Sequence, residues 1–226
     1  YYKVPTKKEI SVDASLLGDS LSYAINYKNW SAILGARFRD NQLLVRQKET
    51  SAQYQPKFVD IQSFITYQKN EYWKFQFLGS IAENEYNFSP TNRQTNFGTI
   101  SDPRAILVYY SGSEKDDYKT YLGALKTTFQ PSTQSKYTLI TSLFNTKEQE
   151  YFDILGQYLL GKPNTEIGSE DFGSIPFAEG IGSQHTHGRN DYDAFIASFK
   201  IDGQHQRNNQ EWRWGCLLYT SDAADE

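Results

Sequence analysis

The chain has 226 residues, enough for one domain or two small ones, and its net charge of −4 gives no electrostatic case for binding nucleic acid. Aromatic residues make up 15% of the chain, and its mean hydropathy is −0.67. No stretch approaches the roughly 20 apolar residues that a membrane-spanning helix needs. That excludes helical spans only, because the strands of a membrane β-barrel expose alternate residues to lipid and look hydrophilic on average.

Alternating apolar and polar residues predict strands along most of the chain. In WSAILGARFR, for example, Trp30, Leu34 and Phe38 share one face, and Arg37 and Arg39 share the other. Stretches with this pattern, or a looser form of it, lie at 10–17, 30–39, 59–68, 73–81, 118–129, 136–144, 194–204 and 211–215. DILGQYLL is the best candidate for a helix, and it suits a loop equally well. We therefore predict an all-β, antiparallel, up-and-down fold of about nine strands.

The predicted connections alternate between short and long. Short ones lie at 28–29, 69–72, 131–135 and 206–210, long ones at 40–57, 84–117 and 147–189, and a tight GDS turn at 18–20. Outer-membrane barrels have short periplasmic turns, long extracellular loops and aromatic girdles at their interfaces. Aromatic residues flank the short turns here, as at Trp30, Trp73 and Trp214. The connections therefore favour a transmembrane β-barrel over a soluble sandwich or propeller, whose strands would alternate in the same way.

Four stretches, in this order along the chain, are similar to a known family. They are SLLGDSLSYAINYKNWSAILGARFRDNQLL, NRQTNFGTISDPRAILVYYSGSEKDDYKTYLGALKT, ITSLFNTKEQEYFDILGQYLLG and HTHGRNDYDAFIASFKIDGQHQ. Over nearly all of residues 4–215, the chain resembles the large TonB-dependent outer-membrane receptors in the form common in Bacteroidetes-type bacteria. The resemblance implies a barrel of about 22 strands around an N-terminal plug. Residues 1–215 would then form roughly the first nine strands of an incomplete barrel, beginning after the plug.

The resemblance also implies a function and its partners. The protein would import a scarce ligand, such as an iron chelate, vitamin, glycan or peptide, across the outer membrane of a Gram-negative bacterium. Its partners would be outer-membrane lipid, the TonB energy-coupling complex and a surface lipoprotein, with no cofactor and no nucleic acid. We expect no enzymatic activity, because nucleotide-binding and hydrolase motifs are missing and no nucleophile stands with a base. The alternatives are a passive, porin-like barrel and a soluble, secreted β-rich binding domain or glycan-active enzyme.

Two sets of residues are candidates for contact with a ligand or with the plug. Strand alternation directs one set to the lumen: Arg37, Arg39, Asp60, Gln62, Lys74 and Gln76. The other set lies in predicted extracellular loops: Tyr109, Tyr110, His185 and His187. Tyrosine rings stack on sugars or chelates, although tyrosine is equally common at ordinary strand ends and interfaces.

Metal binding is considered at two places. In QHTHGRNDYD, His185 and His187 share a face, as do Asp191 and Asp193, and these side chains suit Zn or Fe. However, no third ligand stands at a recognised spacing from the two histidines. The acidic stretch 166–174 offers oxygen ligands for Ca²⁺ without the spacing of an EF-hand loop. We predict solvated polar loops at both places and no metal.

The end of the chain, WGCLLYTSDAADE, departs from the strand pattern. Cys216 is the one cysteine, and Leu217 and Leu218 follow it without alternation. Residues 216–226 also back-translate to a sequence resembling a transposase-type sequencing adaptor, so we predict a non-native tail and exclude it from the fold prediction. Since the chain has no methionine and opens on YYKVPTKKEI, we expect an internal fragment of a longer protein.

Overall fold

The computed structural model describes residues 8–40 and 52–225, and every helix or strand assigned within these ranges is a β-strand. The strands are β1 (Glu9–Ser15), β2 (Gly18–Tyr27), β3 (Trp30–Asp40), β4 (Ala52–Gln68), β5 (Trp73–Pro90), β6 (Arg93–Gly98), β7 (Pro103–Ser132), β8 (Ser135–Gly161), β9 (Ala178–Arg207) and β10 (Gln210–Asp225). Within this part of the chain, no helix is long and apolar enough to cross a membrane. The predicted all-β class is confirmed for the described residues.

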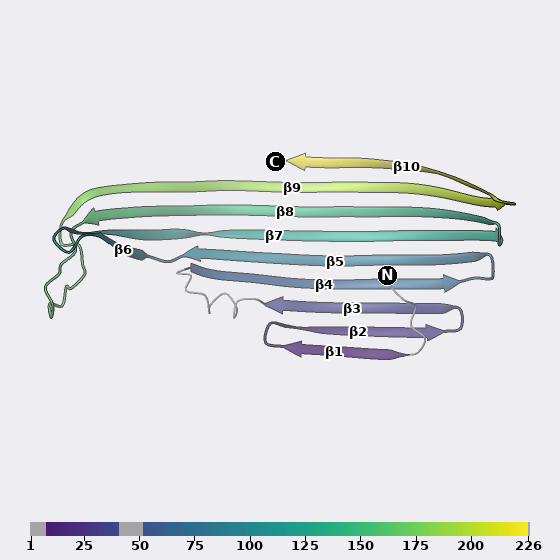
Figure 1. Cartoon of the computed structure of the whole chain (residues 1–226), viewed down its shortest axis with the longest axis horizontal. Coiled ribbons are helices and arrows are strands. Elements are labelled where there is room, and N and C mark those ends of the chain that lie inside the picture. The colour runs from purple at the N-terminus through teal and green to yellow at the C-terminus, as the bar shows by residue number, and fades with distance from the viewer. Residues whose placement is uncertain (1–7, 41–51, 226) are drawn as a thin grey trace.

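All ten strands form one antiparallel sheet. Nine of them follow the path β1-β2-β3-β4-β5-β7-β8-β9-β10, and β6 pairs with β7 beside that path. Figure 1 shows a single long layer, with the connections β2–β3, β4–β5, β7–β8 and β9–β10 all at one end. The up-and-down order is therefore confirmed. The sheet is open, because β1 and β10 stand at opposite ends of the path, so this chain by itself does not close a barrel.

The short turns lie close to their predicted places. Residues 28–29 and 69–72 connect β2 to β3 and β4 to β5, as predicted. Residues 133–134 and 208–209 form tighter turns than expected, because the strands pair further into them. The GDS prediction is wrong: Leu16 and Leu17 make the turn, and Gly18 already pairs with Arg39 in β3.

The predicted long loops are mostly strand, which is the largest correction. Residues 84–88 and 105–117 pair between strands, as do 147–161 with 178–193. DILGQYLL, predicted as helix or loop, is the end of β8 and pairs with β7 on one side and β9 on the other. Two neighbouring strands satisfy its backbone groups, and this outweighs its ambiguous local pattern. Of the predicted loop 40–57, residues 41–51 lie outside the described ranges.

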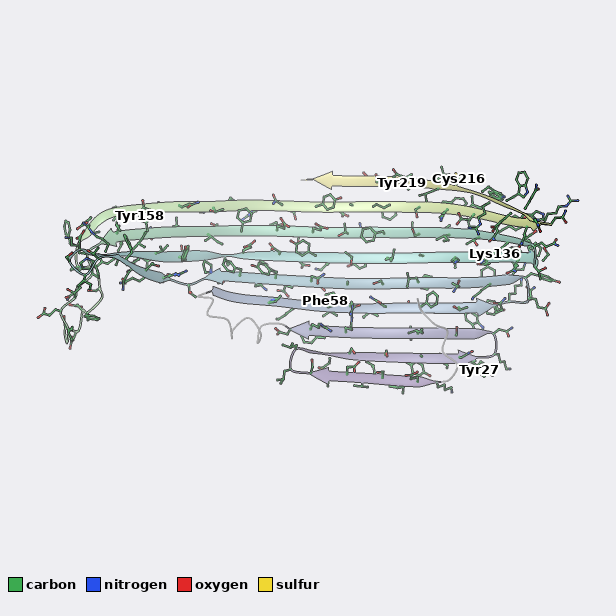
Figure 2. The ribbon with its side chains drawn as sticks, viewed as in Figure 1. Tyr27, Phe58, Lys136, Tyr158, Cys216 and Tyr219 are labelled. Atoms are coloured by element: carbon green, nitrogen blue, oxygen red, sulfur yellow. The ribbon has the colours of Figure 1, made fainter. Side chains whose placement is uncertain are left out.

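The sheet has little interior of its own. The chain exposes 16453 Å², against about 10,500 Å² for a globular monomer of its mass. Ala105 and Ala194 are the only buried apolar residues in the described ranges. Figure 2 shows side chains projecting along the whole length of the strands, without a second layer of ribbon over them. The backbone ladder, rather than a buried core, therefore holds the described layer together.

Residues 216–225, the predicted non-native tail, continue β10 and pair with β9 as far as Asp225 opposite Tyr192. Cys216 is exposed on this edge strand (Figure 2). Backbone pairing is open to almost any sequence, so the foreign origin of the tail stays a prediction.

The two faces of the sheet are named here by residues that lie on them. The tryptophan face carries Trp30, Trp73 and Trp214, and the arginine face carries Arg37 and Arg39. Residues that pair across strands share a face, and successive residues alternate between faces, so the registers assign a face to every paired residue.

Candidate functional site

A row of seven aromatic rings crosses the tryptophan face beside the short turns. In order across the sheet, the rings of this aromatic row are Trp30, Tyr67, Phe75, Trp73, Phe129, Tyr137 and Trp214. Successive ring centroids lie from 4.3 to 6.3 Å apart, within the range of aromatic contacts. On β9 the row crosses Gly203, which pairs with Trp214 and leaves no room for a Cβ beneath the indole. The row forms a continuous belt across the sheet from β3 to β10.

Past the aromatic row, the tryptophan face carries an apolar band and then a row of charges. The apolar band consists of Leu34, Ile61, Phe77, Ile81, Tyr121, Leu125, Leu143, Phe195 and Phe199, each 41–56% exposed. The charged row consists of Glu83, Lys119, Lys147 and Asp193, which are register partners across four strands. Lys119 Nζ lies 3.1 Å from Glu83 Oε1, and Lys147 Nζ lies 3.1 Å from Asp193 Oδ2. The band therefore has a defined border on each side.

The two borders of the apolar band are the same number of residues apart on β5, β7 and β8. Glu83, Lys119 and Lys147 each stand ten positions along their strand from a ring of the aromatic row, namely Trp73, Phe129 and Tyr137. Past the charged row, β5, β7, β8 and β9 continue as paired strands, and we call these continuations the extension. In Figure 1 the extension occupies the end of the sheet away from the short turns.

The six residues predicted to face the lumen all lie on the arginine face, and three of them form one network. Arg37 donates from Nε to Asp60 Oδ1 at 2.7 Å and from Nη2 to Asp60 Oδ2 at 3.0 Å. Gln62 Nε2 donates to Asp60 Oδ2 at 2.9 Å. The Asp60 side chain is 3% exposed and that of Arg37 is 47% exposed, so the guanidinium covers the carboxylate. The remaining three, at other positions of this face, are Arg39, Lys74 and Gln76.

Further along the arginine face, the extension gathers acidic residues that sequence reasoning missed. Asp116 pairs with Glu150 across β7 and β8, and Glu114 precedes it on the same face. Burial, followed by the charges of Glu114 and Glu150, raises the pKa of Asp116, whose Oδ1 has no hydrogen-bond partner among the described residues. Tyr118 donates its hydroxyl to Glu150 Oε1 at 2.7 Å, and this bond raises the pKa of Tyr118. Asp116 and Asp117, as neighbours on a strand, lie on opposite faces, and the register decides which residues they meet across the strands.

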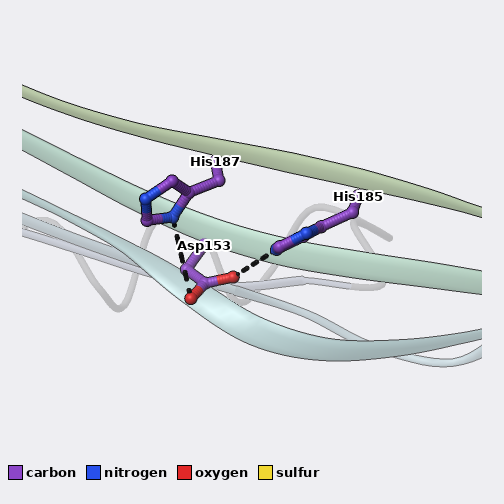
Figure 3. Close-up of side chains that lie close together, drawn as sticks. All are labelled: Asp153, His185 and His187. Carbon is purple, nitrogen blue, oxygen red and sulfur yellow. Dashed lines mark hydrogen bonds and ion pairs between the residues drawn. The ribbon is translucent and has the colours of Figure 1, made fainter.

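On the tryptophan face of the extension, Asp153, His185 and His187 converge (Figure 3). β8 supplies Asp153, which pairs with His187 in β9, and His185 lies two positions along the same face. His185 Nε2 is 2.7 Å from Asp153 Oδ1, and His187 Nδ1 is 3.8 Å from Asp153 Oδ2. The hydrogen bond with His185 lowers the pKa of Asp153. All three side chains are open to solvent, at 50–69% exposure.

This cluster changes the metal hypothesis drawn from the sequence. In the described part of the chain, it is the one group of three His, Cys, Asp or Glu residues whose ligand atoms all lie within 4.8 Å of one another. Asp191 and Asp193, the carboxylates first considered, are engaged elsewhere: Asp191 accepts a hydrogen bond from Tyr151, and Asp193 pairs with Lys147. The third candidate ligand is Asp153, which lies 32 residues before His185. Sequence spacing gave no signal for it, because only the register of β8 and β9 brings it there.

The two predicted ligand-binding tyrosines lie on β7 rather than in a loop. Tyr109 is on the tryptophan face and Tyr110 is on the arginine face, with exposures of 43% and 40%. His185 and His187 likewise lie on a strand, β9. Adjacent residues of a paired strand point apart, so Tyr109 shares a face with the histidines and Tyr110 does not.

Comparisons with protein-family models, curated proteins and solved structures found no match to this chain.

Proposed function

We propose that this chain forms part of the wall of an outer-membrane β-barrel, and that the barrel is a TonB-dependent receptor. The observation that carries the proposal is the apolar band of the tryptophan face, bordered by the aromatic row and the charged row. Membrane barrels present such a band to lipid, with aromatic girdles at the interfaces. In water, the same side chains would form an exposed apolar surface larger than soluble monomers usually carry.

The distance between the two borders suits a bilayer. Ten positions at about 3.3 Å each span about 33 Å along a strand. A strand tilt near 45° reduces this to about 23 Å across the membrane. The apolar band of outer-membrane barrels is about 25 Å tall. The charged row would then lie among the lipid headgroups, where Lys and Glu cost far less than at the midplane.

The two open edges support a barrel over an isolated sheet. β1 and β10 each present one side without a partner in the described sheet, and unpaired backbone groups are too costly to face hydrocarbon. Further strands of the same protein would pair with both edges and close the barrel. The arginine face would then line the lumen, where the Arg37–Asp60 pair meets water and the plug.

The receptor function is proposed from the family resemblance together with the extension. Long paired strands beyond the charged row would stand outside the cell and offer contacts for a scarce ligand, with Tyr109, Tyr110, His185 and His187 as candidates. The ligand would be an iron chelate, a vitamin, a glycan or a peptide, and it would pass through the lumen when the TonB complex displaces the plug. A surface lipoprotein would join the receptor if the ligand is a glycan.

Tryptophan fluorescence tests whether the band contacts lipid. The chain has four tryptophans: Trp30, Trp73 and Trp214 in the aromatic row, and Trp212 nearer the turn. In vesicles of brominated lipid, we expect bromine close to the headgroups to quench them more strongly than bromine at the chain ends. Two results together would indicate the soluble domain instead. They are tryptophan fluorescence that brominated lipid does not quench, and a chain that is a monodisperse monomer in plain buffer.

Uptake by whole cells separates the receptor from the porin-like barrel. Cells that carry the full-length protein should lose uptake of its ligand when TonB is deleted, because the plug then stays in place. Uptake that continues at the same rate without TonB would identify a passive barrel.

A further inference from the structure

We propose that Asp153, His185 and His187 bind a first-row divalent transition metal on the tryptophan face of the extension. The proposal goes beyond receptor function and does not depend on it, because the three ligands need only the register of β8 and β9. Figure 3 shows the two imidazoles directed at the two oxygens of one carboxylate.

The spacing of the ligand atoms fits a metal ion. Zinc bonds to nitrogen and oxygen of about 2.0–2.2 Å place the ligand atoms of a tetrahedral site about 3.3–3.6 Å apart. His185 Nε2 lies 2.7 Å from Asp153 Oδ1 and His187 Nδ1 lies 3.8 Å from the other oxygen, Oδ2, and these distances fall on either side of that range. All three ligand atoms lie within 4.8 Å of one another, so shifts of roughly an ångström complete the geometry.

The backbone under the cluster is held in place by neighbouring strands. β8 pairs with β7 and β9 on its two sides at Asp153. Gly112 of β7 has a φ of 95°, and a Cβ there would collide with the carbonyl oxygen of Asp153. β7 therefore packs directly against the backbone that carries the carboxylate. Sites built on paired strands keep their geometry better than sites on loops.

The donor set selects the class of metal. Two imidazoles and one carboxylate suit Zn²⁺, Co²⁺, Ni²⁺, Cu²⁺ and Fe²⁺, whereas Ca²⁺ and Mg²⁺ prefer oxygen ligands. Three protein ligands leave at least one coordination position open. Arg189, in the next cross-strand pair on this face, has its guanidinium 6.0 Å from the Tyr151 ring. Its positive charge opposes a bare cation and favours an anionic ligand at the open position.

Cobalt titration of the full chain in detergent tests the site, with exposed Cys216 alkylated beforehand. We expect one equivalent of Co²⁺ to give a visible absorption band that Zn²⁺ displaces and Ca²⁺ does not. H185Q, H187Q and D153N should each weaken binding at least roughly tenfold. The matched control is H205Q: His205 is the third histidine of the chain, lies on the same strand and bonds Ser135 at 2.8 Å. H205Q should bind as the wild type does.

Equal weakening by H205Q, or unchanged binding in the H185Q/H187Q double variant, would overturn the proposal. Strand content is followed by circular dichroism, so that a misfolded variant is recognised. A measurement on the wild type needs no variant: Zn²⁺ should protect His185 and His187, but not His205, from diethyl pyrocarbonate. Equal labelling with and without Zn²⁺ overturns the site even if a variant fails to fold. Neither the cobalt titration nor the labelling depends on lipid contact. A negative result in both would therefore overturn the metal site and leave the membrane proposal unaffected.

Discussion

The long strands have two parts whose surfaces differ, although one backbone ladder runs through both. Between the aromatic row and the charged row, the tryptophan face is apolar while the arginine face carries polar groups such as the Arg37–Asp60 pair. In the extension, charged groups stand on both faces, with Asp191 on one and Asp116 on the other. The ladder therefore forms with or without an apolar face. Strand pairing in this sheet therefore does not require the apolar band.

We expect the largest difference between the two parts from one arginine substitution in each part of β7. Leu125 in the apolar band and Tyr109 in the extension lie on the same face of the same strand, and both are 43% exposed. If the band faces lipid as proposed, L125R in vesicles should lower the free energy of unfolding by about 2–4 kcal/mol, because the arginine would face hydrocarbon. Y109R should change it by no more than about 0.5 kcal/mol, because its side chain faces water. Urea titration measures both, and equal losses would contradict the membrane border.

The next effect concerns the opposite face of the same part. R37L removes both guanidinium hydrogen bonds from the buried Asp60 carboxylate, which keeps the bond from Gln62, and should cost about 1–3 kcal/mol in the same titration. R39L is the matched control, because the register partner of Arg39 is Phe58 rather than a carboxylate. If R39L costs as much as R37L, general charge on this face matters and the specific pair does not.

A third substitution tests the close packing of β7 against β8 in the extension. G112A places a methyl group against the Asp153 carbonyl oxygen at a φ of 95°, which should cost about 1–3 kcal/mol locally. Hydrogen exchange should then show faster opening of β7 and β8 around Asp153, with little change in the apolar band. G123A on the same strand meets nothing within 4 Å and should stay within about 0.5 kcal/mol of wild type. Equal protection in both variants would refute the close packing at Gly112.

The smallest expected effect is a change in the stability of the extension with pH. The pKa of Asp116 is raised by burial and by Glu114 and Glu150, so the folded extension holds this proton more tightly than the unfolded chain does. Its contribution to stability is present below the ordinary aspartate pKa and is lost as pH rises through the raised value. Proteolysis of the extension should therefore accelerate over that interval. D116N should resist proteolysis better at neutral pH and flatten the profile, and an unchanged profile would count against the shift.

The local pattern predicted the strands well where one face is mainly apolar and the other is mainly polar. Trp30 and Arg37 were assigned to opposite faces, and the turns at 28–29 and 69–72 were found, because alternation there is sharp. The extension was mistaken for loops since polar and apolar residues are mixed on both of its faces and no regular alternation marks it. DILGQYLL shows the same difficulty: its apolar residues fit several structures, and pairing with β7 and β9 selects strand.

In the strands with sharp alternation, the sequence alone assigned each side chain to a face, because successive residues of a strand point to opposite sides whatever the partner. It also determined the polar residues of the arginine face, including Arg37, Asp60 and Gln62. The strand registers fix how far the strands run past the charged row and which residues meet across them. Asp153 joins His185 and His187, and Asp116 faces Glu150, through registers that connect residues more than 30 positions apart. Such contacts depend on backbone pairing between strands, and no local stretch of sequence contains that information.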